Sequence, residues 1–391
     1  MDDKEILMRV DYNVPLRAGK VADETRLTAS LPTLREVMDR ARRLVLMSHL
    51  GRPKGRPEPG LSLAPVAERL SELLEHPVRH APDCIGDEVA KILQDPEGPR
   101  VVLLENLRYH AEEEKNDEQF AKELARWGDV YINDAFGAAH RAHASTHAVA
   151  RQFQDRGIGR LMERELQALG ALLETPRKPF VAILGGVKIS GKVDVIENLL
   201  SRVQQILVGG AMAFTFHRAR GLETGKTKVE EDRVEMAREL IGKAESAGVE
   251  LLLPTDAILS KSAERSEGMR TRPVTEVGAD EMAVDIGPDT VDQFRRRIFK
   301  AKTIFWNGPM GIFEVDDFSK GTLAVAQALA DATAGAEGGG DAATVVGGGD
   351  SVAALQKLGL VDAMTHVSTG GGASLEFVGG RELPGVKILE S

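Results

Sequence analysis

Glycines that directly follow apolar runs are the most chemically suggestive feature of the second half of the chain. Three such runs end in Gly185-Gly186, Gly209-Gly210 and Gly347-Gly348-Gly349. Beyond the carboxyl end of a parallel strand, glycine lets a ligand approach the backbone, and the N-terminus of the next helix favours phosphate. Three turns of this kind together predict a nucleotide crevice, although each one alone equally suits a plain strand-to-helix turn.

Charged side chains beside these glycines would complete a phosphate site. Lys188 and Lys192 follow the first glycine pair and suit phosphate, but as surface lysines they would need no ligand. Asp350 stands at an expected helix start, where it either caps the helix or holds a Mg²⁺ that bridges phosphates. Glu314, in a Gly/Pro loop, suits ribose hydroxyls, and the Gly370–Gly372 amides suit an anion. Neither G-x-x-x-x-G-K-[ST] nor G-x-G-x-x-G occurs, which disfavours a P-loop kinase and a classical dehydrogenase.

The first half of the chain carries arginines and histidines instead. Clusters at His49–Arg52, Arg108–His110 and His140–His143 each follow an expected strand. A planar guanidinium group can donate two hydrogen bonds to one carboxylate or phosphate. The clusters therefore predict a binding patch for a ligand that carries a phosphate and a carboxylate. The alternative is that these arginines are ordinary solvated surface residues. The spacing of His140–His147 would also suit a metal, but no Cys or HExxH pattern supports one. The acidic run Glu112–Glu114 is expected to be a solvated helix start.

Short apolar runs alternate with longer amphipathic segments, which is typical of βαβ units and a parallel sheet. A charged helical segment, 159–173, precedes Pro176 and Pro179, and the proline pair predicts a domain boundary. The glycine-rich stretch 335–340 is expected to be a surface loop. Strands are expected near 6–10, 44–48, 101–104, 129–133, 180–184, 206–209, 250–253, 303–307 and 343–346, and helices near 29–42, 64–75, 85–93, 117–127, 160–174, 190–204, 229–246, 289–301, 319–332 and 351–359.

Composition excludes several classes of protein. The length of 391 residues favours two domains, and the net charge of -10 gives no basic footprint for nucleic acid or an anionic membrane. The single cysteine, Cys84, excludes a disulfide framework and a cysteine zinc site, and it fits a reducing compartment. No apolar signal core or membrane-length apolar run is present, so the cytoplasm is the expected location.

Six motifs, in their order along the chain, resemble those of the phosphoglycerate kinase family. The resemblance runs from about residue 6 to the C-terminus. The motifs are Val10-Asp11-Tyr12-Asn13-Val14-Pro15, Met47-Ser48-His49-Leu50-Gly51-Arg52-Pro53, Leu104-Glu105-Asn106-Leu107-Arg108, Asn133-Asp134-Ala135-Phe136-Gly137, Trp306-Asn307-Gly308-Pro309 and Gly347-Gly348-Gly349-Asp350.

The resemblance implies an α/β fold of two doubly wound, parallel-sheet, Rossmann-like domains joined by a hinge helix. Residues 1–158 would bind 3-phosphoglycerate, 159–175 would form the hinge, and 176–382 would bind Mg-ATP or Mg-ADP, with the tail 383–391 packed on the N-terminal domain. It implies a cytoplasmic monomer of glycolysis and its reverse. The activity would be reversible, Mg²⁺-dependent phosphoryl transfer between ATP and the carboxylate of 3-phosphoglycerate, with hinge-bending closure.

Site residues carry over by similarity. The substrate set would be Asp11, Asn13, Arg26, His49, Arg52, Arg108 and Arg141. The nucleotide set would be Gly186, Lys188, Lys192, Gly210, Asn307, Pro309, Gly311, Glu314, Gly347, Gly348, Gly349, Asp350 and Ser351, with Asp350 near Mg²⁺. Catalysis would fall to Arg26, Lys188, Lys192 and the amides of Gly371 and Gly372.

Two positions depart from the family pattern on the nucleotide side. Lys228 stands where an apolar residue commonly meets adenine, and Val187 replaces a usual alanine. Two other functions remain as alternatives: a catalytically silent nucleotide-binding relative, and an unrelated two-domain dehydrogenase. The intact set of Arg26, Arg141, Lys192 and Asp350 argues against the first, and the missing dinucleotide fingerprint argues against the second.

Overall fold

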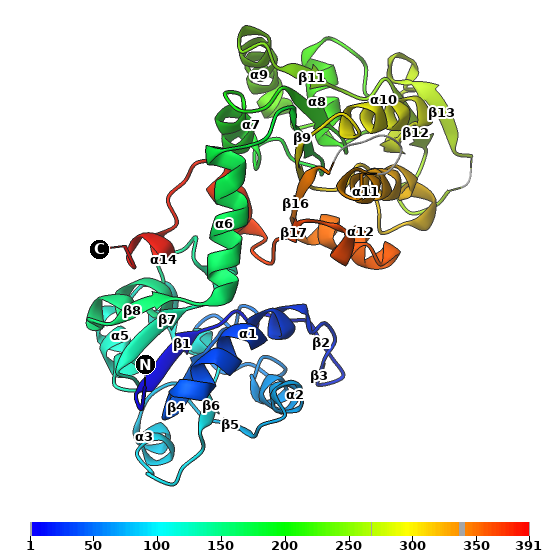
Figure 1. The fold of residues 1–391 in the computed structure, drawn as a ribbon. Coiled ribbons are helices and arrows are strands. Elements are labelled where there is room, and N and C mark those ends of the chain that lie inside the picture. Colours follow the sequence, from blue (N-terminus) through cyan, green and yellow to red (C-terminus); the bar gives the residue numbers. More distant parts are fainter. Residues whose placement is uncertain (1, 267, 336–340, 391) are drawn as a thin grey trace. The chain divides into compact units, whose positions relative to one another are not determined.

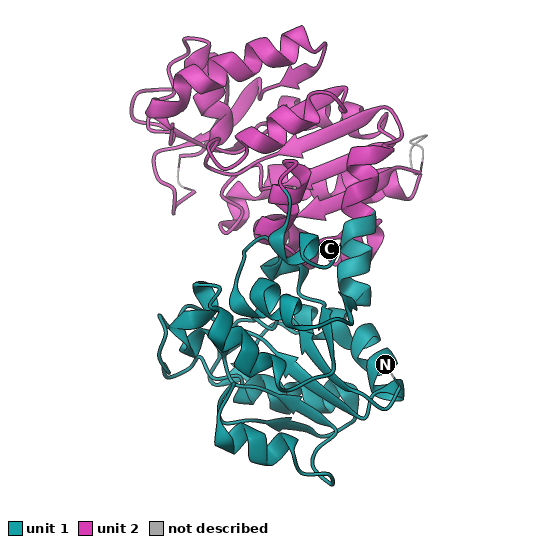
Figure 2. Cartoon of the chain, turned by 90° about the vertical axis from the view of Figure 1, so that its left-hand side faces the viewer, with its two compact units in different colours: residues 1–167, 382–391 teal, residues 168–381 magenta. Residues whose placement is uncertain are grey.

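The computed structural model describes residues 2–266, 268–335 and 341–390, so most of the glycine-rich stretch expected as a loop lies outside the described residues. The chain divides into two compact units, Met1–Gln167 with Glu382–Ser391, and Ala168–Arg381 (Figure 2). Helix α6, Arg160–Glu174, spans this division. No helix within the described ranges is long and apolar enough to cross a membrane.

Unit 1 is built on a six-stranded parallel sheet of order β5-β6-β4-β1-β7-β8 (Figure 1). Alternate residues of β1 enter two different cores: Ile6 and Met8 face one, and Leu7 faces the other. Both faces of the sheet are therefore covered, as a doubly wound fold requires. The strands are β1 Glu5–Arg9, β4 Arg43–Met47, β5 Val78–His80, β6 Val101–Leu103, β7 Val130–Asn133 and β8 Arg156–Ile158, with a hairpin of β2 Leu16–Arg17 and β3 Lys20–Val21.

Helices cover both faces of this sheet. Residues of α1 and α2 join the core of Ile6, and residues of α3 and α5 join the core of Leu7. The tail of the chain also belongs to this unit, where Asn133 Nδ2 donates to Gly385 O at 3.0 Å. The helices are α1 Thr25–Arg40, α2 Ala64–Leu74, α3 Asp87–Leu93, α4 Ala111–Glu114, α5 Glu118–Ala125 and α14 Pro384–Lys387.

Unit 2 has a second six-stranded parallel sheet, of order β11-β10-β9-β15-β16-β17, and a small antiparallel sheet of order β13-β12-β14. The parallel strands are β9 Phe180–Leu184, β10 Gln205–Val208, β11 Glu250–Leu252, β15 Thr303–Asn307, β16 Ala343–Gly347 and β17 His366–Val367, and the antiparallel ones are β12 Asp256–Ser260, β13 Arg270–Pro273 and β14 Met282–Ile286. The helices are α7 Val193–Leu199, α8 Met212–Ala219, α9 Val234–Ser246, α10 Pro288–Ile298, α11 Lys320–Thr333, α12 Gly349–Leu358 and α13 Gly372–Val378.

The expected fold class, two doubly wound parallel-sheet units, is confirmed. Every expected strand and helix is present. The ends of β9, β15 and α6 are as expected and the others are shifted, and α7 is much shorter than the expected 190–204. The sequence analysis did not predict the small antiparallel sheet. Its strand β13 is Arg270-Thr-Arg-Pro273 and is exposed throughout, whereas β12 and β14 contain short apolar runs that were not assigned to strands. The sequence analysis also missed β5 and β17, which are too short to form an apolar run.

Candidate functional site

The carboxyl edge of the unit 1 sheet gathers the arginines and histidines that the sequence singled out. Strands β1, β4, β6 and β7 are mutually parallel, so the loops that follow them share one edge. Those loops carry, in turn, Asp11 with Asn13, His49 with Arg52, Arg108, and Arg141, while Arg26 comes from the first turn of α1.

Hydrogen bonds join most of these residues. Arg26 Nη1 lies 2.7 Å from Asp11 Oδ2. Asn13 Oδ1 accepts from Gly51 N at 2.9 Å, and Arg108 Nη1 donates to Gly51 O at 2.8 Å. Through Gly51, the loops after β1, β4 and β6 are therefore held together.

Of the two remaining arginines, Arg141 is linked to this group through its charge. Burial lowers the pKa of Arg108, and the charge of Arg141 acts in the same direction, so the two guanidinium groups lie within electrostatic reach. Arg141 and Arg52 are exposed, Arg52 in the loop that contains Gly51. The structure thus brings the expected substrate residues to one sheet edge and leaves two of their guanidinium groups open to solvent.

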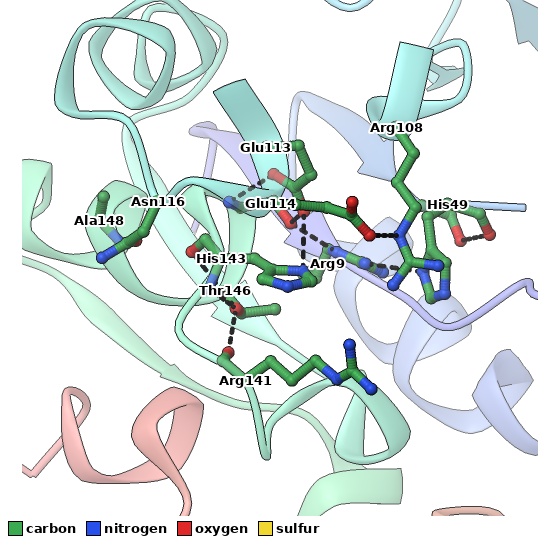
Figure 3. A network of polar contacts seen from close by, with 12 residues as sticks. Arg9, His49, Arg108, Glu113, Glu114, Asn116, Arg141, His143, Thr146 and Ala148 are labelled. Atoms are coloured by element: carbon green, nitrogen blue, oxygen red, sulfur yellow. Dashed lines mark hydrogen bonds and ion pairs between the residues drawn. The ribbon is translucent and has the colours of Figure 1, made fainter. Parts of the chain in front are cut away.

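A buried polar layer supports this edge (Figure 3). Arg9, the last residue of β1, is 1% exposed, and Glu113 is 0% exposed. The expectation that Glu112–Glu114 is a solvated run is therefore wrong for Glu113, because this carboxylate accepts hydrogen bonds from Ser145 N at 2.9 Å and Ser145 Oγ at 2.6 Å. Sequence reasoning missed Arg9, whose signal was a charged residue at the end of an apolar strand.

Two histidines beside these arginines, His49 and His143, have lowered pKa values. Burial, with the charges of Arg9, Arg108 and Arg26, holds the pKa of His49 well below its usual range. Burial and the charge of Arg108 lower the pKa of His143 to about 4. The positive charge of this edge therefore comes from the arginines.

In unit 2, the strand order reverses direction between β9 and β15, which is where open α/β sheets bind ligands. The glycine turns after β9, β10 and β15 pack directly on one another there. Gly186 N donates to Pro309 O at 2.8 Å, and Gly210 N donates to Met310 O at 2.9 Å. A Cβ at Gly185 would lie 2.1 Å from Pro309 O, so the close approach of these turns requires glycine.

A cavity of about 410 Å³ opens at these turns. Most of its wall is apolar, as a nucleobase and ribose require. Of the expected nucleotide residues, it is lined by Gly186, Gly210, Pro309, Gly311, Glu314 and Asp350. Both departures from the family pattern, Lys228 and Val187, also line the cavity. The sequence analysis missed several other lining residues, some of which lie on the unpredicted strands β12 and β14. These residues are Phe214, Lys226, Thr227, Ala257, Met282, Val284, Asp285 and Ile286.

Lys192 lies just before α7, beside this cavity. It is 8% exposed, and its Nζ donates to Asn307 Oδ1. Burial lowers the pKa of Lys192 to about 8, against the opposing charge of Asp350. Asn307 Nδ2 is buried and has no hydrogen-bond partner in the described residues, so one donor here is left for a ligand.

The remaining expected residues adjoin this group. Ser351 Oγ accepts from Gly308 N at 2.7 Å, which ties α12 to the loop after β15. A Cβ at Gly347 would lie 3.0 Å from Ser374 Oγ, which places α13 and its first glycines, Gly371 and Gly372, beside the end of β16. Asp350 is exposed; partial burial and the charge of Glu314 raise its pKa.

Lys188 sits in a loop that a carboxylate anchors. Glu230 Oε2 accepts from Ile189 N at 2.5 Å and Ser190 N at 3.2 Å, and Glu230 Oε1 accepts from Ser190 Oγ at 2.6 Å. Sequence reasoning missed Glu230, for which there was no local signal.

An arginine-rich edge in one α/β unit and a glycine crevice with a buried lysine in the other are the surroundings that anionic, phosphate-bearing ligands favour. The model of the family described as phosphoglycerate kinase matches residues 1–381. The chain is 55% identical over 390 residues to the phosphoglycerate kinase of Chlorobium luteolum, with 99% of this chain and 96% of that protein covered. It is 53% identical to that of Chlorobaculum tepidum, with 100% and 97% covered.

Solved structures agree with these relatives. The phosphoglycerate kinase of Coxiella burnetii superposes with a TM-score of 0.86 at 39% identity, covering 100% of this chain and 96% of that one. The enzyme of Pyrococcus horikoshii gives 0.86 at 32% identity, with the same coverage. This chain belongs to the phosphoglycerate kinase family, which confirms the expected family and does not favour a silent relative or a dehydrogenase.

Proposed function

We propose that the chain transfers a phosphoryl group reversibly between Mg-ATP and the carboxylate of 3-phosphoglycerate, with ADP and 1,3-bisphosphoglycerate on the other side of the reaction. Membership of the phosphoglycerate kinase family supports this activity. The observation that carries the residue assignment is the contrast between the two sheet edges, one rich in arginine and one built of glycine turns around a cavity.

The arginine edge of unit 1 would hold 3-phosphoglycerate. Planar guanidinium groups suit both of its anionic groups, the phosphate and the carboxylate. The assigned binding residues are Asp11, Asn13, Arg26, His49, Arg52, Arg108 and Arg141. In this assignment Asp11 orients Arg26 through their 2.7 Å ion pair rather than touching the anion itself.

The crevice of unit 2 would hold the nucleotide. The apolar cavity accepts the adenosine, with Glu314 at the ribose, and the glycine turns, Lys188 and Lys192 accept the phosphates. Gly347, Gly348, Gly349 and Ser351 shape the start of α12 beside the phosphates. The Nδ2 of Asn307, which lacks a partner, supplies a further donor.

The residues present also fit a Mg²⁺ ion that travels with the nucleotide. Mg²⁺ prefers oxygen ligands and commonly takes one carboxylate together with substrate phosphates. Asp350 offers an exposed carboxylate in the first turn of α12, next to the cavity, and has no salt-bridge partner in the described residues. Bound there, the ion would neutralise phosphate charge, and Asp350 is the group that would hold it.

The chemistry needs no general base, because the acceptor carboxylate is already ionised at neutral pH. A carboxylate oxygen forms a bond to the γ-phosphorus while the bond to the β,γ-bridging oxygen breaks, and ADP leaves. Arg26, Lys188, Lys192 and the amides of Gly371 and Gly372 would stabilise the charge on the transferred group, so catalysis rests on positioning and electrostatics. Hinge-bending that lets Arg26 and Lys192 act on one phosphoryl group stays a prediction, as do a monomeric state and a cytoplasmic location.

The direct test measures ADP formation from Mg-ATP with and without 3-phosphoglycerate, with Lys192→Ala as the blank and Lys300→Ala, an exposed lysine of the same unit, as the control. We expect turnover that depends on 3-phosphoglycerate, survives in the control and collapses in the blank. Folded wild-type protein that binds Mg-ADP but does not turn over would contradict the proposal.

A further inference from the structure

The buried layer below the arginine edge ends at a ring nitrogen of His49 (Figure 3). Arg9 Nη2 lies 3.0 Å from His49 Nδ1, and Arg9 Nε donates to Ser145 Oγ at 2.8 Å. Both Arg9 and His49 are buried, at 1% and 6% exposure. A charged guanidinium buried this deeply needs fixed partners, because the cost of removing it from water is large.

Glu113 supplies that partner through a serine. Ser145 Oγ lies 2.6 Å from Glu113 Oε1, and its hydroxyl has one proton to give. That proton goes to the carboxylate, which has none to donate while it is ionised, and the serine lone pair is left to accept from Arg9 Nε. Burial raises the pKa of Glu113, and the charge of Arg9 and the two bonds from Ser145 oppose that shift. With Glu113 ionised, each hydrogen bond along Glu113, Ser145 and Arg9 has one direction.

The same argument determines which ring nitrogen of His49 carries the proton. A guanidinium can only donate, so the 3.0 Å contact from Arg9 requires Nδ1 of His49 to be the acceptor. In a neutral imidazole one nitrogen accepts and the other carries the proton, which places the proton on Nε2. Among the described residues, the ring of His49 makes its hydrogen bond through Nδ1, to Arg9, and not through Nε2.

We infer that Arg9, held by Glu113 through Ser145, fixes His49 as the Nε2–H tautomer, so that His49 presents a neutral N–H donor to an anionic oxygen of the substrate. Arg9 and Glu113 are then positioning residues that act through His49. The role toward the substrate rests on the proposed function, since that is what assigns His49 to 3-phosphoglycerate; the tautomer itself does not.

The surroundings exclude the other two states of the ring. The Nδ1–H tautomer would aim a proton at a guanidinium N–H and a lone pair at the anion. The imidazolium is opposed by burial and by the charges of Arg9, Arg108 and Arg26, with His143 also within reach. Arg9 and Arg108 are the two charges with the largest effect on His49, and they come from different elements, β1 and the segment after β6.

The test is ¹⁵N NMR of the full-length protein with ¹⁵N-labelled histidine rings, in which a protonated and an unprotonated ring nitrogen resonate far apart. His49→Gln identifies the His49 signals. We expect Nε2 protonated and Nδ1 unprotonated, unchanged between pH 6 and pH 8. A protonated Nδ1 in the wild-type protein, or an imidazolium in that range, would overturn the inference without the need for any other variant.

Variants of Arg9 and Glu113 test whether these residues set the tautomer of His49. Arg9→Met with Glu113→Gln removes both buried charges together and avoids leaving either unpaired. We expect the His49 signals to become a mixture of tautomers or to titrate in this double variant, while Glu112→Gln, on the exposed face of the same helix, leaves them unchanged. Signals that stay identical to wild type in the folded double variant would show that Arg9 does not set the tautomer.

Binding of 3-phosphoglycerate separates this inference from the proposed function. The amide nitrogen of Gln overlaps the position of histidine Nε2, whereas that of Asn overlaps Nδ1. We expect His49→Gln to keep 3-phosphoglycerate affinity within about twofold and His49→Asn to lose roughly five- to tenfold, with Mg-ADP affinity unchanged in both. Equal affinities in wild type, Gln and Asn variants, beside an Nε2–H signal, would overturn the substrate role of His49 and leave the tautomer assignment standing.

Discussion

Under the proposed function, the two sheet edges bind their anions with different parts of the polypeptide. At the edge of unit 1 the proposed donors are side chains, above all arginines, and Arg9, Ser145 and Glu113 form a buried hydrogen-bonded layer that reaches His49. At the crevice of unit 2 the proposed phosphate site uses backbone groups of glycine turns, which pack closely on one another because they carry no Cβ. Side-chain sites depend on charge and orientation, whereas backbone sites depend on the absence of a Cβ.

The buried charges differ in the same way. In unit 1 the guanidinium of Arg9 is compensated by a carboxylate through one serine. In unit 2 Lys192 is buried beside an amide oxygen of Asn307, and burial lowers its pKa to about 8. A poorly compensated lysine gains more than a compensated one from an arriving phosphate, and this suits a group that acts on the transferred phosphoryl.

The largest effect is expected at that lysine. Lys192→Ala should lower kcat by about 10²- to 10³-fold, because one preorganised cation at the developing charge is lost. Affinity for Mg-ADP should change far less, since the cavity and glycine turns remain. Steady-state kinetics with equilibrium binding of Mg-ADP checks this, with Lys300→Ala as control. A loss of affinity as large as the loss of kcat would make Lys192 a binding residue only.

Arg141→Ala tests the other edge. It should weaken 3-phosphoglycerate binding roughly 10- to 100-fold, the usual worth of a hydrogen-bonded charge, and leave Mg-ADP binding unchanged. Arg151→Ala is the matched control, because Arg151 is an exposed arginine of the same unit that pairs with Glu118 at 3.1 Å. The division between the two edges would be broken if Arg141→Ala weakened both ligands equally.

Gly210→Ala tests the claim that the crevice is a backbone site. Gly210 has φ +68, and an added Cβ would lie 2.4 Å from Gly186 O. We expect a loss of about 1–3 kcal/mol in unfolding free energy and weaker Mg-ADP binding, because the turn must shift. Gly242→Ala, on the exposed face of α9 with nothing within 4 Å of the added Cβ, is the control. Thermal unfolding measures the stability of each variant, and calorimetry measures its affinity for Mg-ADP. The claim would be refuted if the two variants had the same stability and the same Mg-ADP affinity.

The smallest effect concerns pH. Because burial lowers the pKa of Lys192 to about 8, the side chain of the ligand-free protein is a cation below that pH and loses its charge above it. The value of kcat/KM for the nucleotide should therefore fall by about half at pH 8 relative to pH 7 and continue to fall as pH rises. Lys192→Arg keeps its charge and should lack the fall, if it is active. A flat profile to pH 9.5 in the wild type would contradict the assigned pKa.

The sequence predicted the parts of the molecule that repeat a local pattern. Apolar runs ending in glycine located β9, β10 and β16 and the turns of the crevice, because both signals lie within a few residues. Phe214 and Met282 were not predicted as site residues. They reach the cavity only through the packing of α8, which carries Phe214, and of the small antiparallel sheet, which carries Met282. Glu113 was assigned to solvent because its acidic neighbours dominate the pattern, and only the placement of Ser145 reveals its partner. The role of Glu113 therefore leaves no local signal in the sequence.

The central claim is that each unit binds one substrate with its own kind of site. Calorimetric titration of 3-phosphoglycerate and of Mg-ADP, separately, into wild type, Arg141→Ala and Gly210→Ala tests it most directly. The account predicts a crossed result: Arg141→Ala loses 3-phosphoglycerate affinity alone, and Gly210→Ala loses Mg-ADP affinity alone. If either folded variant lost both affinities to the same extent, or lost the opposite one, the account would be contradicted.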